Sequence, residues 1–155
     1  MHCNIIELQT DKDRCGQSSL PDWFSYGGCT SYKRIEKKDY KRVSEKTFDM
    51  LEFMGFKIDR KEETVTIDKD NILKHFEHSF ECFKKQSSAM TLEDFAQEDK
   101  IYYLQECIEN KRGTYVYCDD MLYTFDGFLR ELMPELQKMD REMTFYLGDL
   151  YDYKY

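Results

Sequence analysis

Two segments of the chain, residues 55–68 and 113–126, carry the same order of structural signals. Each begins with a glycine that suits a helix end, continues with two short runs of alternating apolar and polar residues, and ends with an aspartate that suits a helix start. Alternation with a period of two is typical of β-strands, and two such runs joined by a polar turn predict a β-hairpin. Stretches with helical periodicity flank both segments. We therefore expect an α+β protein in which helices pack on two short β-hairpins.

The same periodicity predicts the order of elements. We expect strands at residues 3–8 and 143–147, hairpins at 56–67 and 114–125, and helices at 38–54, at 69–85, at 91–112 and at 127–139. Asp68 or Asp70 would cap the second helix, a Thr91–Asp94 capping box the third, and Asp126 the last. A break is expected at residues 87–88, and Pro134 predicts a kink or a restart in the last helix.

Residues 36–86 and 91–140 form two expected helix–hairpin–helix units. Their glycines, their aspartates and also Thr66 and Thr124 align at a common offset of 58 positions, which is consistent with a weak internal duplication. Any such unit needs a glycine stop and an aspartate cap, however, so the similarity also has a local explanation. In both cases we expect a single compact domain over residues 1–155, with a loop-rich N-terminal arm at 1–35 and a strand with an acidic, tyrosine-rich tail at 141–155.

The composition excludes several classes of protein. Of 155 residues, 15% are aromatic whereas only 2 are proline and 7 are glycine, which is the opposite of a disordered chain. The apolar runs are far shorter than the ~18 residues of a membrane-spanning helix, and residues 1–11 lack the apolar stretch of a signal peptide. We therefore expect a cytoplasmic protein without membrane association.

The six cysteines are expected to be free thiols. None forms a Cys-x-x-Cys pair, and thiols of cytoplasmic proteins stay reduced, so most of them should serve as small core residues. The even number also allows a secreted domain with three disulfides, which is the alternative.

Motifs for cofactors are missing from the sequence. The seven glycines form neither a dinucleotide-binding Gly-x-Gly-x-x-Gly pattern nor a phosphate-binding Gly-x4-Gly-Lys loop. Asp68 and Asp70 begin a stretch that resembles a calcium loop, but Leu73 and Ser79 stand where such a loop needs glycine and glutamate. We expect no cofactor.

His75, His78 and Cys82 are the residues that best suit a metal site. On a helix they fall on one side, and nitrogen and sulfur ligands at this spacing suit zinc. His75 and Cys82 are about 10 Å apart along a helix axis, however, so one ion would use His78 with only one of them. A half-buried polar flank explains the three residues without a metal, and we assign no metal ligand.

Cys29 is a candidate nucleophile because it follows two glycines in an expected loop. Thiol catalysis needs a nearby base, and the sequence places none of the three histidines beside it. We expect an ordinary loop cysteine and assign no catalytic residue.

Residues 31–46 contain seven basic and three acidic side chains. The bases spread over about half of the expected helix, which favours a solvated face. A direct nucleic-acid contact through Lys37, Lys41 and Arg42 is the alternative, and we rank it below the solvated face.

Acidic residues gather in the C-terminal half. Between residues 91 and 110 there are six acids and one lysine, and most of the acids lie on the side of the expected helix opposite Ile101, Leu104 and Ile108. An ordinary solvated helix face is one explanation, and a binding face for a basic partner is the other. The candidate partner-binding residues are Asp94, Glu98, Asp99, Glu106, Glu109, Asp119, Asp120, Asp149, Tyr151, Asp152 and Tyr153.

These observations predict a small acidic binding protein without enzymatic activity. It would inhibit another macromolecule, a protein with a basic surface, by occupying that surface, as an anti-CRISPR or anti-restriction inhibitor of a nucleic-acid-handling protein or a toxin-immunity protein would. The alternative is a metal- or thiol-dependent enzyme that uses His75, His78 and a cysteine.

Overall fold

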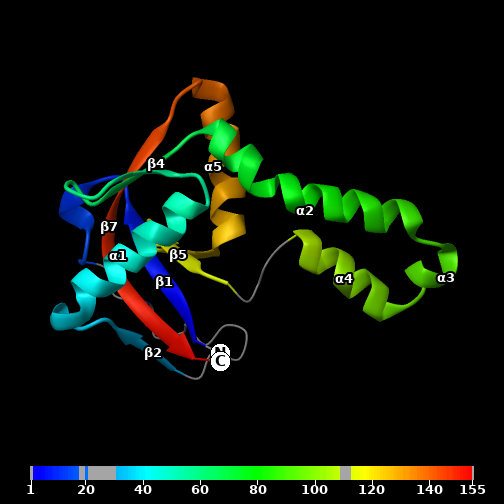
Figure 1. Cartoon of the computed structure of the whole chain (residues 1–155), viewed down its shortest axis with the longest axis horizontal. Helices are drawn as coiled ribbons and strands as arrows, with labels where there is room; N and C mark the ends of the chain where they lie inside the picture. The colour runs from blue at the N-terminus through cyan, green and yellow to red at the C-terminus, as the bar shows by residue number, and fades with distance from the viewer. Residues whose placement is uncertain (1, 18–19, 21–30, 109–112, 155) are drawn as a thin grey trace.

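The computed structural model, which describes residues 2–17, 20, 31–108 and 113–154, contains one mixed sheet with helices packed on it (Figure 1). The strands are β1 (His2–Gln9), β2 (Ser31–Arg34), β3 (Lys57–Asp59), β4 (Thr64–Ile67), β5 (Tyr115–Cys118), β6 (Met121–Thr124) and β7 (Met143–Lys154). Their order is β3-β4-β7-β1-β5-β6, and β2 also pairs with β7. The helices are α1 (Lys37–Phe53), α2 (Lys69–Ala89), α3 (Leu92–Phe95), α4 (Glu98–Ile108) and α5 (Phe125–Met139), with a short 3-10 turn, η1 (Lys12–Arg14). The expected α+β class in a single compact domain is confirmed.

The C-terminal strand β7 lies in the middle of the sheet. One of its edges pairs antiparallel with β1, from His2 opposite Lys154 to Gln9 opposite Tyr146. Its other edge is shared by β4 and β2. The expected strand at 143–147 was therefore too short, because residues 149–153 continue it rather than forming a tail.

The strand expected at residues 3–8 is confirmed as β1, and it runs between β7 and β5. β1 is parallel to β5, with Ile5 opposite Tyr115. The N-terminal arm thus begins with an interior strand of the sheet. Its residues 18–19 and 21–30, Cys29 among them, lie outside the described residues.

Both expected hairpins are present, as β3–β4 and β5–β6. Asp119 and Asp120 form the two-residue turn of the second hairpin, and their φ angles of 48° and 63° are those of the left-handed turns that match strand twist. The hairpins occupy opposite ends of one sheet, and the division into two helix–hairpin–helix units stays a prediction. The suggested duplication stays a prediction.

The helices agree with the expected ones except at some of their ends and in the division of the third. Asp68 caps α2 by accepting a hydrogen bond from the Asn71 N–H at 2.8 Å. The break expected at residues 87–88 is absent, because the Ser87 hydroxyl donates to the Lys84 carbonyl and α2 continues to Ala89. The third expected helix is instead divided into α3 and α4, although its capping box of Thr91 and Asp94 is formed.

The last helix, α5, begins two residues earlier than expected, because Thr124 and not Asp126 caps it by accepting from the Gly127 N–H at 3.0 Å. Pro134 lies inside α5 without dividing it. Leu132 and Leu136, on either side of the proline, are buried against the core and hold both halves of the helix in place.

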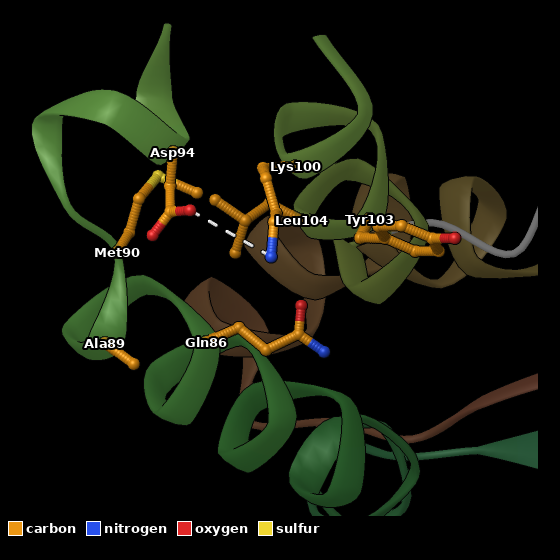
Figure 2. A pocket seen from close by; sticks show the side chains of 7 residues that line it. All are labelled: Gln86, Ala89, Met90, Asp94, Lys100, Tyr103 and Leu104. Carbon is orange, nitrogen blue, oxygen red and sulfur yellow. Dashed lines mark ion pairs between the residues drawn. The ribbon is translucent and has the colours of Figure 1, made fainter. Parts of the chain in front are cut away.

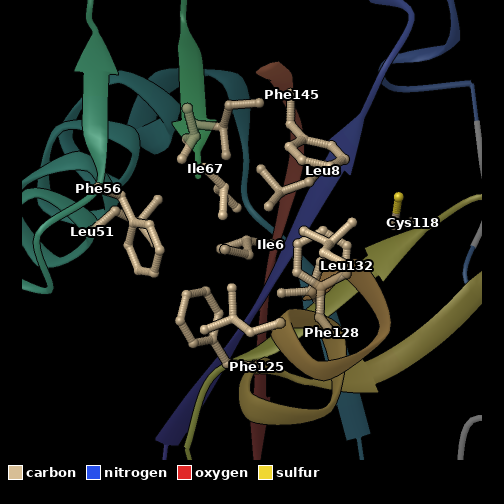
Figure 3. Packing of buried hydrophobic residues seen from close by; sticks show 14 of the residues in the cluster. Ile6, Leu8, Leu51, Phe56, Ile67, Cys118, Phe125, Phe128, Leu132 and Phe145 are labelled. Carbon is tan, nitrogen blue, oxygen red and sulfur yellow. The ribbon is translucent and has the colours of Figure 1, made fainter. Parts of the chain in front are cut away.

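The main core lies between the sheet and the helices α1 and α5. Figure 3 shows Ile6, Leu8 and Phe145 from the strands meeting Phe128 and Leu132 from α5. The opposite face of the sheet holds a smaller cluster of Ile5, Leu20, Tyr115, Tyr117 and Tyr151. Several tyrosines therefore serve the core, and this is one reason why the aromatic content is high.

Gly55 ends α1 in the left-handed region, with φ at 94°. Its N–H donates to the Glu52 carbonyl, and the N–H of Phe56 donates to that of Leu51, which completes the helix end. No atom lies within 4 Å of a Cβ built at Gly55, so a side chain at this position would not clash with its surroundings. Its only cost would be the strain of an L-residue in the left-handed backbone conformation.

We therefore expect Gly55→Ala to lower the free energy of unfolding by about 1 kcal/mol, since an L-residue is strained in this region. Gly55→Asn is the matched control and should lose less, because asparagine tolerates left-handed backbone better than alanine. Urea denaturation of the three proteins measures the effect. Equal stability of the alanine variant and the parent would contradict it.

Candidate functional site: an acidic helical projection

Helices α2, α3 and α4 extend away from the sheet and form what we call the projection, residues 69–108 (Figure 1). α2 leaves the sheet directly after β4, and the chain returns along α4, which packs beside α2. In α2 only Ile72 is buried, and none of the residues in α3 or α4 is buried. The projection is therefore held by its root and by the contact between its own helices.

The side of α4 that faces α2 is only partly covered. Ile101 and Leu104 are half-buried, as expected for an inward stripe, but Ile108 is 44% exposed. The predicted buried stripe was thus wrong at its C-terminal end, because a pair of helices covers less surface than a complete core does.

Large apolar side chains are concentrated on the surface of the projection. Nine such residues are exposed in the part of the chain that the structure describes, and seven of them belong to the projection: Leu73, Phe80, Leu92, Phe95, Tyr102, Tyr103 and Ile108. Leu92 is 85% exposed and Phe95 61% exposed. Exposed apolar side chains that gather in one place mark interaction surfaces.

Carboxylates lie among these apolar residues. Glu93, Glu98, Asp99 and Glu106 are exposed, whereas Asp94 is half-buried at the start of α3. Hydrogen bonds from the Thr91 N–H and hydroxyl, together with the charge of Lys100, hold the pKa of Asp94 below its ordinary value. The predicted residues Asp94, Glu98, Asp99 and Glu106 are therefore brought together on one part of the molecule, and Glu109 lies outside the described residues.

Asp119 and Asp120 lie elsewhere, in the β5–β6 turn. Asp119 forms an ion pair with Arg14 at 2.5 Å, and Asp120 accepts a hydrogen bond from the Tyr117 hydroxyl at 3.1 Å. Both side chains are exposed, but they are tied to neighbours in the body and do not extend the surface of the projection.

The predicted residues of the C-terminal segment lie in β7, and the structure corrects their role. Asp149 is 9% exposed and pairs with Arg34 at 2.5 Å. Tyr151 is 6% exposed, and burial raises its pKa to about 12. These two side chains are not on an exposed binding face, because Tyr151 packs in the smaller cluster on one face of the sheet and Asp149 is held by Arg34. Asp152 is half-buried, and nothing is described of the Tyr153 side chain.

Sequence reasoning missed the most buried acid of the described chain, Glu7. It is 0% exposed and accepts hydrogen bonds from the N–H groups of Gly16 and Asp149 and from the Gln9 amide, at 3.0, 2.7 and 3.2 Å. Gly148 faces it across a bulge between β1 and β7. The only sequence signal for this site was the alternation in β1, where Glu7 and Gln9 stand between apolar residues. The same alternation is typical of a solvated strand face, so it could not predict that Glu7 is buried.

The candidate metal and thiol residues do not assemble. His75 Nε2 lies 2.8 Å from the Asp126 carboxylate, among the rings of Phe56, Phe76 and Phe125, while His78 contacts Cys82 at 3.7 Å. His75 thus joins the root of α2 to the start of α5. Among the described residues, no group of three or more metal-ligating side chains comes together.

Thiol activation is also unsupported at two of the cysteines. Burial raises the pKa of Cys15 to about 11 and that of Cys118 to about 12, and neighbouring carboxylates act in the same direction. Cys15, Cys82, Cys107 and Cys118 are all free thiols.

The basic segment is partly neutralised by its own neighbours. Lys33 and Lys38 both pair with Glu36, and Arg42 pairs with Asp39. Lys37 and Lys41 are exposed on α1. The structure therefore offers no continuous row of unpaired bases along the described part of α1.

Comparisons with protein-family models, with curated proteins and with solved structures found no match for this chain. No helix in the described ranges has the length and apolar character needed to cross a membrane.

Proposed function

We propose that the protein is a non-enzymatic binding protein whose projection docks onto a basic surface of another protein and occupies it. The observation that carries this proposal is the concentration on the projection of seven of the nine exposed large apolar side chains in the described chain. Aromatic and apolar anchors supply most of the affinity of protein interfaces, and charges around them select the partner.

The charge of the projection points to a basic partner. Residues 91–108 contain five carboxylates and one lysine, all on α3, α4 and the residues between them. A second copy of the chain is disfavoured as the occupant, because a two-fold interface would place this acidic surface against itself. A partner with basic residues around an apolar patch fits both features.

Proteins that handle nucleic acids present such basic surfaces. The acidic residues of α3 and α4 suit a basic groove that otherwise holds a nucleic acid, whereas α2 carries four lysines and three acids. We therefore propose an antagonist of a nucleic-acid-handling protein, in the manner of an anti-CRISPR or anti-restriction inhibitor or of a toxin-immunity protein.

The test is charge reversal with a matched control. Glu98→Lys with Glu106→Lys changes two exposed acids of α4, and Glu131→Lys with Glu135→Lys changes two exposed acids of α5 by the same total charge. Partners captured from cell extract by the tagged parent protein are identified by mass spectrometry, and their affinities for the three proteins are then measured.

We expect the α4 variant to lose about 10- to 100-fold in affinity, which corresponds to roughly 1–3 kcal/mol, while the α5 variant binds like the parent. The captured partner should also bind nucleic acid less well when the protein is added. Equal capture of one specific partner by both variants would show that the acids of α4 do not select the partner, and docking of an acidic projection onto a basic surface would be wrong.

A further inference from the structure

The tip of the projection contains a pocket of about 310 Å³ between the end of α2 and the start of α4. Its walls are formed by Gln86, Ala89, Met90, Asp94, Lys100, Tyr103 and Leu104. A volume near 300 Å³ is at the small end for ligand sites and suits a single side chain of a partner better than a large metabolite.

Figure 2 shows Lys100 reaching into this pocket from α4, toward the carboxylate of Asp94 and above the amide of Gln86. Lys100 Nζ and Asp94 Oδ1 are 4.0 Å apart, which is too long for a direct hydrogen bond. The other oxygen of Asp94 accepts a hydrogen bond from the Thr91 N–H at 3.1 Å, which holds the carboxylate in place. The pocket thus already contains a cation of this chain that is weakly held.

The remaining wall is apolar and aromatic. Ala89, Met90 and Leu104 line it, and Tyr103, 58% exposed, stands at its border. A fitting occupant needs an apolar stem for this wall and a cationic head for Asp94. Arginine and lysine share that design, but a planar guanidinium can bridge the Asp94 carboxylate and the Gln86 amide and also stack on an aromatic ring.

We propose that this pocket receives an arginine side chain of the partner protein, which displaces Lys100 from Asp94. The inference rests on the proposed function, since it assigns one anchor residue to the basic surface that the projection occupies. Displacement costs little because exposed ion pairs contribute little to stability.

Removal of the Lys100 side chain is expected to strengthen arginine binding. Because Lys100 competes with the incoming arginine, Lys100→Ala should bind arginine more tightly, by roughly 2- to 5-fold. Tyr103→Ala should bind it about 3- to 10-fold more weakly, since the ring no longer stacks on the guanidinium. A purely structural role for Lys100 would move the affinity in the opposite direction.

The experiment titrates the isotope-labelled full chain with N-acetylarginine methylamide and follows the backbone amide signals by NMR. The citrulline analogue has the same shape without the charge, and the lysine analogue keeps the charge without the planar head. We expect saturable shifts confined to residues 86–104 with arginine, weaker binding of lysine by about 3-fold or more, and none of citrulline. Met121→Ala, a change of an exposed residue in β6 outside the projection, is the control variant and should bind like the parent.

Three results would overturn the proposal: no shifts at residues 86–104, equal binding of citrulline, or weaker binding of arginine by Lys100→Ala. Because this titration needs no partner, its failure is separate from that of the proposed function. Loss of partner capture in the α4 charge-reversal variant, without arginine binding here, would leave the docking surface intact and remove only the arginine pocket.

Discussion

Gly148→Ala is expected to destabilise the protein by about 3 kcal/mol or more, which lowers the melting temperature by roughly 6–12 °C for a chain of this size. A Cβ built at Gly148 would lie 2.3 Å from Oε2 and 2.6 Å from Cδ of Glu7. Non-bonded atoms do not approach so closely, so either the Glu7 side chain or the strand must move.

Neither movement is easy, because Glu7 is fixed by its hydrogen bonds. Its Oε2 accepts from the N–H groups of Gly16 and Asp149, and its Oε1 accepts from the Gln9 amide. If the carboxylate moves away, two backbone N–H groups lose a partner beside a fully buried side chain. Each unsatisfied buried group costs about 1–3 kcal/mol, and the clash itself adds about 1–3 kcal/mol when the surroundings yield.

A double-mutant cycle separates this contact from a general intolerance of the bulge. In the background Glu7→Ala the carboxylate is gone, so adding Gly148→Ala should cost at least 1 kcal/mol less than in the parent. Urea denaturation of the four proteins gives the coupling free energy. The same cost in both backgrounds would mean that Gly148 is needed for backbone conformation and not for the approach of Glu7.

Elements with local signals could be predicted from the sequence. α1 ends where Gly55 indicates, and the β3–β4 hairpin lies where alternation places it. These elements depend on spacing and on residues close together in the chain, which is the information that a single sequence carries most directly.

Elements that depend on distant partners could not be predicted. The acids of β7 resemble a solvated tail until Arg34, 115 residues away in sequence, is placed beside Asp149. The strand is interior because β1, β2 and β4 all pair with it, and strand pairing is not visible in a single segment. For the same reason Asp149 and Tyr151 were assigned to a surface that they do not reach.

In the projection, the helices could be predicted from local signals, whereas their exposure depends on distant parts of the chain. The helical character of residues 69–85 and 91–108 and the acidic side of the latter could be read from periodicity, but not the division between α3 and α4. Their exposure could not, because an apolar stripe predicts burial wherever a core is available. Only the arrangement in space shows that α3 and α4 are covered by little besides α2.

The thiols of Cys118 and Cys15 are expected to be alkylated slowly, and this tests the idea of a thiol-dependent enzyme. Burial is the largest of the causes that raise the Cys118 pKa from 9.0 to about 12, and the charge of Asp119 raises it further. A raised pKa leaves less thiolate at a given pH, so at neutral pH the reactive form falls about 1000-fold. The greater nucleophilicity of a more basic thiolate recovers only about 20-fold of this loss.

Iodoacetamide should therefore modify Cys118 at least about 50-fold more slowly in the folded protein than in the urea-unfolded chain, and its burial slows the reaction further. For Cys15, whose pKa is raised to about 11, the same reasoning gives about 10-fold. The half-buried Cys107 of the projection provides an internal reference in the same peptide-mapping experiment. If Cys15 or Cys118 instead reacts as fast in the folded protein as in the unfolded one, the prediction is wrong. A faster reaction in the folded protein would mean that the thiol is activated by its surroundings, and a thiol-dependent activity would become the better account of this protein.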